Sequence, residues 1–387
     1  MTKALTAREI LDRLVAFPTV SDQSNLDLID WVEGYLEDLG VAATRVWNSD
    51  RTKASLYSSI GPEVEGGIIL SGHTDVVPVV GQSWSTDPFQ VTEKDGLLYG
   101  RGTCDMKGFD ALALAAVPMA LECDLKRPLQ IALSYDEEVG CLGAPDMIDE
   151  MARHLPRASA AIIGEPSMMR VATGHKGSTG WNIHVRGHEV HSSIMHTGVS
   201  AIMEGAKLIE WANRMNAENR ARKPGPLAAI FEPHWTTIHV GLIQGGTASN
   251  ITAKDCRFCL DFRVVPGESG EEWDARLQDE IARLDAAMKE IHPDAGITAE
   301  CRFRMPALLP EADGAAERAA RQLTGDNATN VVSYGTEAGQ FQERGFSAVI
   351  CGPGNIAQAH QANEYISLSQ FAAGARFIDD LVASLCR

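Results

Sequence analysis

The fold is decided by residues 67–75, Gly-Ile-Ile-Leu-Ser-Gly-His-Thr-Asp, where a short apolar run leads directly into His73 and Asp75. A short apolar run of this kind is typical of a strand that is buried on both faces of a sheet. Two later runs, 129–134 and 160–164, lead in the same way into carboxylates. Because the ligand site of an open α/β sheet lies beyond the carboxyl ends of its strands, we expect these polar residues to share one crevice.

Helical periodicity separates these apolar runs along the first 177 residues. Alternating helices and strands indicate an α/β layer with a largely parallel sheet. The same rhythm returns after Pro306, with another apolar run at 348–351 and His360 shortly after it. The expected helices are 7–15, 25–39, 110–121, 144–155, 314–323 and 368–385.

A different order of elements occupies residues 178–304. The expected elements are a strand, a helix, two strands, a helix and a strand, over 180–186, 199–215, 236–244, 250–264, 270–291 and 297–303. This βαββαβ order is that of a small, ferredoxin-like α+β domain. The sequence therefore predicts a catalytic domain made of 1–177 and 305–387, with a second domain, 178–304, inserted in it.

Length and composition agree with this organisation and exclude several classes of protein. The 387 residues leave room for two domains, and 44% hydrophobic with 22% charged residues is an ordinary globular composition. The formal net charge of −18 would repel a phosphate backbone, so we expect no nucleic-acid partner. The longest apolar run, 111–121, is too short to cross a bilayer, so we expect no membrane partner.

Cysteine usage and the N-terminal sequence favour a cytoplasmic protein. The 8 cysteines are scattered without framework spacing, and residues 1–20 lack the continuous apolar core of a signal peptide. Reduced thiols are then the default expectation. Cys256 and Cys259 form a Cys-x-x-Cys pair, but they lie in an expected strand, where positions three apart face opposite sides. We therefore do not expect a zinc ribbon or a redox site there.

The polar residues of the expected crevice form a pattern that metal ions would stabilise. His73 is joined there by the acidic run 136–138, by Glu165, and by Asp105 in the glycine-rich turn 100–108. Buried carboxylates raise one another's pKa unless positive charge compensates them. Imidazole and carboxylate ligands without matched thiolates favour zinc, with cobalt, manganese or iron as alternatives. Two ions bridged by one carboxylate would use two imidazoles and three carboxylates.

These motifs, in this order, resemble those of the dinuclear zinc deacylases and metallopeptidases. That family includes acetylornithine deacetylases, succinyl-diaminopimelate desuccinylases and glutamate-releasing carboxypeptidases, and the resemblance covers essentially the whole chain. The resemblance is strongest to the acetylornithine deacetylases, in the stretches 134–140, 163–166, 175–177, 334–338 and 352–361. It implies a zinc-peptidase-like α/β catalytic domain with an inserted α+β domain that serves as a lid and in dimerisation.

The resemblance also implies the ligands of two Zn²⁺ ions per subunit, with Co²⁺ as a replacement. Asp105 would bridge the two ions. His73 and Glu165 would complete one site, and Glu138 and His360 the other. On spacing alone, His234 and His292 remain alternatives to His360.

Two further roles follow from the same resemblance. Asp75 is expected to accept a hydrogen bond from the other ring nitrogen of His73, which fixes the tautomer of a ligand. Glu137 is expected to be the general base, which takes a proton from the attacking water and delivers it to the leaving amine. A cis peptide between Asp105 and Met106 is also implied.

In the inserted domain, the resemblance assigns His191, in the segment 187–193, to the site of the neighbouring subunit of a homodimer. His191 would stabilise the oxyanion of the tetrahedral intermediate. Asn250 and Arg263 would bind the substrate, with Arg263 holding an α-carboxylate. His188 and His196, which lie close by in the sequence, remain alternatives to His191. Arg263 could instead form an ion pair with an acidic residue of the same domain.

The activity implied by the resemblance is removal of the N-acetyl group from N2-acetyl-L-ornithine, a small-molecule substrate, in arginine biosynthesis. We add the hypothesis that Glu337 faces the substrate and favours a cationic side chain. The segment 194–198 departs from the expected pattern. Other N-acyl amino acids, succinyl-diaminopimelate and carboxypeptidase substrates therefore stay open. The non-enzymatic alternative is a relative that binds small ligands without turnover, although every expected ligand and the base are present.

Overall fold

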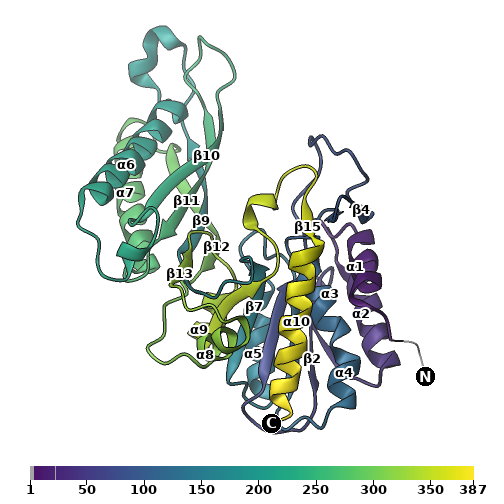
Figure 1. The fold of residues 1–387 in the computed structure, drawn as a ribbon. Coiled ribbons are helices and arrows are strands. Elements are labelled where there is room, and N and C mark those ends of the chain that lie inside the picture. The colour runs from purple at the N-terminus through teal and green to yellow at the C-terminus, as the bar shows by residue number, and fades with distance from the viewer. Residues whose placement is uncertain (1–3, 22) are drawn as a thin grey trace. The chain divides into compact units, whose positions relative to one another are not determined.

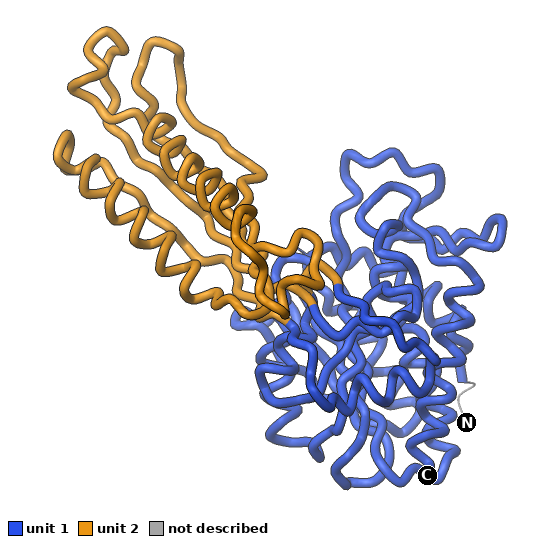
Figure 2. Tube along the Cα trace, turned by 60° about the vertical axis from the view of Figure 1, so that its left-hand side comes forward, with its two compact units in different colours: residues 1–174, 308–331, 336–387 blue, residues 175–307, 332–335 orange. Residues whose placement is uncertain are grey.

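The computed structural model describes residues 4–21 and 23–387, which form two compact units (Figure 1). The first unit takes in the chain up to Gly174 together with Leu308–Val331 and Thr336–Arg387, drawn in blue in Figure 2. The second unit comprises His175–Ala307 and Val332–Gly335. The second unit therefore interrupts the first. The short segment 332–335, which the sequence analysis placed in the first domain, groups with the second unit.

An eight-stranded sheet forms the centre of the first unit, in the order β1-β2-β6-β3-β7-β14-β8-β13. The four central strands, β6, β3, β7 and β14, run parallel, and β2 and β8 pair antiparallel on either side of them. The expected large, mostly parallel sheet is therefore confirmed. The strand bounds are β1 Ala43–Trp47, β2 Ala54–Ile60, β3 Ile68–His73, β6 Leu129–Ser134, β7 Ala160–Pro166, β8 Ala172–His175, β13 Asn330–Val332 and β14 Ala348–Gly352.

The central strands are buried on both faces. In β6, Leu129, Ile131 and Leu133 belong to the hydrophobic cluster that also contains side chains of α1, α3, α8 and α10. Gln130 and Ala132 alternate with them in the strand and are buried as well. Burial of both faces explains why these strands read in the sequence as continuous apolar runs.

Helices cover the sheet (Figure 1). The expected helix 110–121 is in fact two helices, because Pro118 has no N–H to donate to the carbonyl of Leu114, and α3 ends at Ala115. The helix bounds are α1 Ala7–Ala16, α2 Leu26–Asp38, α3 Lys107–Ala115, α4 Val117–Glu122, α5 Ala144–His154, α8 Ala315–Thr324, α9 Ala338–Glu343 and α10 Leu368–Leu385.

A small antiparallel sheet joins two distant parts of the first unit. Its order is β15-β5-β4, with bounds β4 Thr92–Lys94, β5 Leu97–Tyr99 and β15 Tyr365–Ser367. Tyr365 pairs with Tyr99 in this sheet. The pairing places the segment after His360 beside the glycine-rich turn that carries Asp105.

The second unit is a four-stranded antiparallel sheet in the order β10-β11-β9-β12, with the helices α6 and α7. Trp181, Phe258 and Trp273 lie in its own hydrophobic cluster. The chain order confirms the expected βαββαβ pattern. The bounds are β9 Gly177–Arg186, α6 Ala201–Ala221, β10 Thr237–Gly245, β11 Asp255–Val264, α7 Gly270–Ile291 and β12 Gly296–Met305.

The 8 cysteines are all free thiols. Within residues 4–21 and 23–387, we find no helix with the length and apolar character that crossing a bilayer requires.

Candidate metal centre

The carboxyl ends of three parallel strands carry the expected polar residues. His73 is the last residue of β3, and it pairs in register with Ser134, the last residue of β6. The turn with Glu137 and Glu138 follows β6 directly, and Glu165 is the penultimate residue of β7. Because parallel strands end at the same edge of the sheet, these polar residues meet there, as predicted from the sequence.

Asp105 lies between two imidazoles. Its Oδ1 is 3.1 Å from Nε2 of His73, and its Oδ2 is 3.2 Å from Nε2 of His360. The two oxygens of one carboxylate thus face two different histidines, an arrangement suited to a ligand that bridges two ions. The peptide between Asp105 and Met106 is cis, as the resemblance implies.

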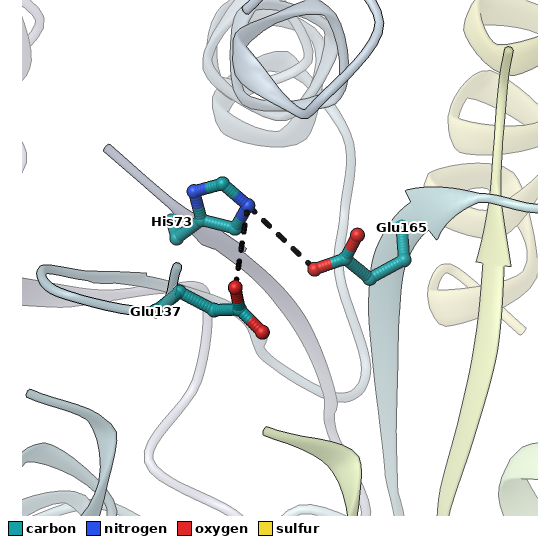
Figure 3. A group of neighbouring side chains, drawn as sticks. All are labelled: His73, Glu137 and Glu165. Atoms are coloured by element: carbon teal, nitrogen blue, oxygen red, sulfur yellow. Dashed lines mark ion pairs between the residues drawn. The ribbon is translucent and has the colours of Figure 1, made fainter. Parts of the chain in front are cut away.

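The glutamates divide between the two histidines. Figure 3 shows Glu165 and Glu137 pointing toward the same nitrogen of His73, Nε2, with Oε1 of Glu165 at 3.6 Å and Oε2 of Glu137 at 4.0 Å. Oε2 of Glu138 instead lies 3.0 Å from Nε2 of His360. The neighbouring residues Glu137 and Glu138 therefore differ in the histidine with which they form an ion pair. The His73, Glu137, Glu165 group and the His73, Asp105, Glu138 group each place their ligand atoms within 4.8 Å of one another.

Burial leaves this cluster short of positive charge. Burial first of all, and then the neighbouring carboxylates, raise the pKa of Glu137 to about 8 and raise the pKa of Glu165 well above its usual range. Burial alone would lower the pKa of His73, but its hydrogen bond to Asp105 and the surrounding carboxylates raise it well above its usual value. The carboxylates therefore favour any positive charge that is placed among them, which divalent cations would supply.

The donor set fits divalent cations. It consists of two imidazoles and several carboxylates, which are ligands for zinc and for harder divalent ions. Cys104 and Cys141 lie nearby, but burial raises the pKa of both thiols. Among the described residues, neither thiol belongs to a group whose ligand atoms lie within 4.8 Å of one another. The residues present thus fit a pair of metal ions held by nitrogen and oxygen.

Asp75 differs from the expectation in how it contacts His73. Nδ1 of His73 is 2.9 Å from the main-chain oxygen of Asp75 and 3.6 Å from its Oδ1, so the carbonyl is the closer acceptor. The Asp75 carboxylate accepts the main-chain N–H groups of Glu137, at 3.0 Å, and Glu138, at 3.3 Å. It also accepts the hydroxyl of Ser21 at 2.7 Å. Asp75 thus orients His73 through its backbone and holds the acidic turn through its side chain.

His360 is held in place through both its backbone and its side chain. Its φ is +63°, in the left-handed region, and its main-chain oxygen accepts a hydrogen bond of 2.9 Å from Nε2 of Gln82. Its side chain is 52% exposed, whereas that of His73 is 1% exposed. The contacts with Asp105 and Glu138 distinguish His360 from the alternatives that the sequence left open.

Two residues that the sequence analysis missed, Arg101 and Glu364, organise the turn that carries Asp105. Both side chains are 1% exposed, and Nη1 of Arg101 lies 2.6 Å from Oε2 of Glu364. Oε1 of Glu364 accepts three main-chain N–H groups of the turn, those of Gly102, Cys104 and Asp105, at 2.9, 3.0 and 3.1 Å. The available signals were a basic residue in a glycine-rich turn and an acid four residues after His360, but no spacing rule links them.

Glu337 does not face a substrate, and the expectation for it is corrected. Its residue is 1% exposed. One carboxylate oxygen accepts the hydroxyl of Ser71, and the other accepts the hydroxyl of Ser134 at 2.8 Å. Burial raises the pKa of Glu337. Glu337 is therefore a core carboxylate that ties α9 to the ends of β3 and β6.

His191, Asn250 and Arg263 belong to the second unit, not to the cluster around Asp105. His191 and Asn250 are neighbours there, because the main-chain N–H of Ser192 donates to the oxygen of Asn250 at 2.9 Å. The side chain of Arg263 is 41% exposed, and its Nε lies 3.7 Å from Oδ2 of Asp261.

Known proteins match this chain along its whole length. The model of peptidase family M20/M25/M40 matches residues 69–384. An acetylornithine deacetylase of Myxococcus xanthus is 35% identical over 391 residues, covering 98% of this chain and 97% of that protein. An acetylornithine deacetylase of Salmonella arizonae is 33% identical over 385 residues, with the same coverage of 98% and 97%.

Solved structures match the fold. An M20 family metallo-carboxypeptidase from Sulfolobus solfataricus matches with a TM-score of 0.80 at 17% identity, covering 98% of this chain and 99% of that one. A dinuclear metal binding peptidase of the M20 family from Bacillus subtilis matches with a TM-score of 0.61 at 14% identity, covering 98% and 97%. With the polar cluster at the strand ends, the two imidazoles beside Asp105 and the full-length sequence match, the chain belongs to peptidase family M20/M25/M40 and is a hydrolase of that family.

Proposed function

We propose that the protein is a metal-dependent amidohydrolase that removes the N-acetyl group from N2-acetyl-L-ornithine and releases L-ornithine and acetate. The observation that carries the proposal is Asp105, whose two oxygens lie 3.1 and 3.2 Å from Nε2 of His73 and of His360. The choice of N2-acetyl-L-ornithine over other deacylase substrates is supported by full-length similarity to acetylornithine deacetylases, one of which is 35% identical. The product would enter arginine biosynthesis.

Two Zn²⁺ ions are the proposed cofactors, with Co²⁺ as a replacement. Asp105 would bridge them, His73 and Glu165 would complete one site, and Glu138 and His360 the other. When bound, such ions polarise the acyl carbonyl and make water more acidic.

Glu137 is the proposed general base. It takes a proton from the water that attacks the acetyl carbon, and it delivers this proton to the amine nitrogen as the carbon–nitrogen bond breaks. The hydrogen bond from its main-chain N–H to Asp75, 3.0 Å long, fixes the turn from which its side chain extends. Its residue is only 8% exposed, which keeps bulk water from competing for the proton.

His191 is the proposed donor to the oxyanion, and its own surroundings support this role. The main-chain N–H of Ser193 donates to Nδ1 of His191 at 3.2 Å, and the Ser193 hydroxyl lies 2.8 Å from the same nitrogen. An N–H group can only donate, so Nδ1 of the neutral ring carries no proton and Nε2 does. An Nε2–H group is the donor that a tetrahedral oxyanion requires.

We place His191 in the site of a neighbouring subunit, in a homodimer formed by the second units. Strand β10 pairs with β11 on one side only, among the described strands, which leaves an edge open to a partner. Large apolar side chains are also exposed on this unit, a property typical of interfaces. They include Ile194, Met195, Ile202, Met203, Leu242, Ile243 and Ile251.

Arg263 and Asn250 are the proposed substrate contacts. The guanidinium of Arg263 is a planar fork that matches an α-carboxylate, and its weak contact with Asp261, 3.7 Å long, leaves donors free for one. We further propose that the protein acts in the cytoplasm, which the 8 free thiols support.

A panel of substrates tests the proposal. The metal-loaded protein is given N2-acetyl-L-ornithine, acetylated neutral amino acids, succinyl-diaminopimelate and a dipeptide, and the release of acid or amine is measured. We expect the highest kcat/KM for N2-acetyl-L-ornithine. A clear preference for another compound of the panel would make that compound the substrate instead. If no compound is turned over while metals are bound, the deacylase proposal is wrong.

A further inference from the structure

The turn after β6 contains a thiol that contacts the proposed base. Cys141 is 0% exposed, and its Sγ lies 3.2 Å from Oε1 of Glu137. The main-chain N–H of Cys141 donates to the carbonyl of Glu137 at 2.9 Å. The main-chain oxygen of Cys141 accepts Nε2 of Gln340 at 3.1 Å. Contacts on both of its backbone polar groups therefore hold the thiol against the carboxylate.

The two oxygens of the Glu137 carboxylate have different surroundings. Oε1 meets the thiol of Cys141, whereas Oε2 faces Nε2 of His73 at 4.0 Å. Burial keeps Cys141 as a thiol, so it can only donate to a carboxylate. A thiol is also a weak donor, so it orients the carboxylate with little reduction of its basicity. Without the S–H group of Cys141, Oε1 of Glu137 would lose this hydrogen-bond partner in a buried position, which costs free energy.

We propose that Cys141 is a positioning residue for Glu137: its S–H group holds Oε1, so that Oε2 is directed toward the reacting atoms. This inference rests on the proposed function, in which Glu137 is the base. It adds a residue that takes no part in metal binding or in substrate contact.

Steady-state kinetics test the proposal. Because the Glu137 carboxylate is no longer oriented when the donor to Oε1 is removed, Cys141→Ala should lower kcat about tenfold, which corresponds to about 1.4 kcal/mol of activation free energy. KM and metal content should stay at wild-type values. Cys141→Ser, which restores a donor of similar size, should recover kcat to within about twofold. Cys351→Ala, which removes an equally buried thiol from β14, should leave kcat unchanged. An unchanged kcat in Cys141→Ala, or a Cys141→Ser variant as impaired as Cys141→Ala, would overturn the proposal.

A measurement without turnover separates this inference from the proposed function. Hydrogen bonding lowers the infrared S–H stretching frequency, and a difference spectrum between wild type and Cys141→Ala isolates the band of this thiol. We expect the band to move to higher frequency in Glu137→Ala. A band that stays in place rules out the contact, even if the protein proves to act on another substrate.

Discussion

Glu137 and Glu138 are neighbours in sequence, yet their carboxylates occupy different positions. Oε2 of Glu138 is 3.0 Å from Nε2 of His360, whereas Oε2 of Glu137 stays 4.0 Å from Nε2 of His73. Glu137 is the proposed base, whereas Glu138 is a proposed metal ligand. We therefore predict that Glu137→Gln lowers kcat by about a thousandfold and keeps the wild-type metal content. Glu138→Gln should lose about one metal equivalent per chain.

Metal analysis by mass spectrometry, together with kcat on N2-acetyl-L-ornithine, checks this pair of variants. The comparison is matched, because both substitutions remove one negative charge from adjacent positions of the same turn. A Glu137→Gln protein that loses metal in the same proportion as Glu138→Gln would make Glu137 a ligand and leave the base unassigned.

Glu337 yields a prediction about pH. Burial raises the pKa of Glu337 above its usual 4.5, so the folded protein binds more protons at this site than the unfolded chain. Stability contributed by this carboxyl is therefore present at low pH and is lost as the pH rises through the raised value. We therefore compare the free energy of unfolding of the wild type with that of Glu337→Gln. The wild-type value minus the variant value should be smaller at about pH 8 than at about pH 5.

Urea denaturation of both proteins at the two pH values measures this difference. The same variant tests whether Glu337 faces the substrate. Because both carboxylate oxygens accept serine hydroxyls in the core, the ratio of activity on N2-acetyl-L-ornithine to that on acetylated neutral amino acids should not change in Glu337→Gln. If this activity ratio were lower in Glu337→Gln than in the wild type, Glu337 would contact the substrate after all.

At the scale of elements, the ion pair between Arg101 and Glu364 joins the turn with Asp105 to the segment that follows His360. Breaking a buried pair leaves an uncompensated charge and costs about 3 to 5 kcal/mol. We predict that Glu364→Gln lowers both the melting temperature and the metal content. The amide has no charge to compensate Arg101, and its NH2 group must face either Arg101 or the three main-chain N–H groups of the turn, all of which are donors.

The matched control for this prediction is Glu93→Gln. It also breaks an arginine–glutamate pair, with Arg8, but at the surface, where the two side chains are 33% and 52% exposed. A pair of this kind contributes about 1 kcal/mol or less, so stability and metal content should remain near wild type. If Glu364→Gln kept both metal equivalents while losing stability, Glu364 would support the fold and not the metal centre.

The elements predicted from the sequence are those with a strong local pattern. β3, β6, β7 and β14 are short apolar runs, and α7 carries a helical periodicity over its whole length. The edge strand β1 and its neighbour β2 were missed for different reasons. No residue of β1 is fully buried. β2 is almost wholly buried, but Ser55, Ser58 and Ser59 interrupt its sequence, so it contains no continuous apolar run. The three-residue strands of the small sheet depend on pairing with distant chain segments, which no local pattern records.

The site divides in the same way. The residues at strand ends, such as His73 and Glu165, were predicted because topology alone brings them to one edge. Contacts that depend on exact side-chain positions were not predicted. No local pattern showed that the Asp75 carboxylate accepts main-chain N–H groups of the acidic turn, or that Glu364 accepts those of the turn with Asp105. Local spacing also could not show that Glu337 points into the core.

At the scale of the whole molecule, the proposed dimer makes each active site depend on two chains. His191→Ala and Glu137→Gln should each be nearly inactive alone, since one lacks the oxyanion donor and the other the base. If His191 acts in the neighbouring subunit, a mixed dimer has one site with both defects and one site with neither. Random re-association of equal amounts makes half of the dimers mixed, so about a quarter of wild-type activity should return.

The measurement is acetate release after the two variants are unfolded together, refolded and loaded with metal, with each variant refolded alone as the control. Light scattering or ultracentrifugation confirms that the mixture is dimeric. A histidine that served its own subunit would leave both chains of the mixed dimer defective, and activity would stay at the level of the single variants. Recovered activity can arise only from a site shared between chains, because neither chain alone carries both His191 and Glu137.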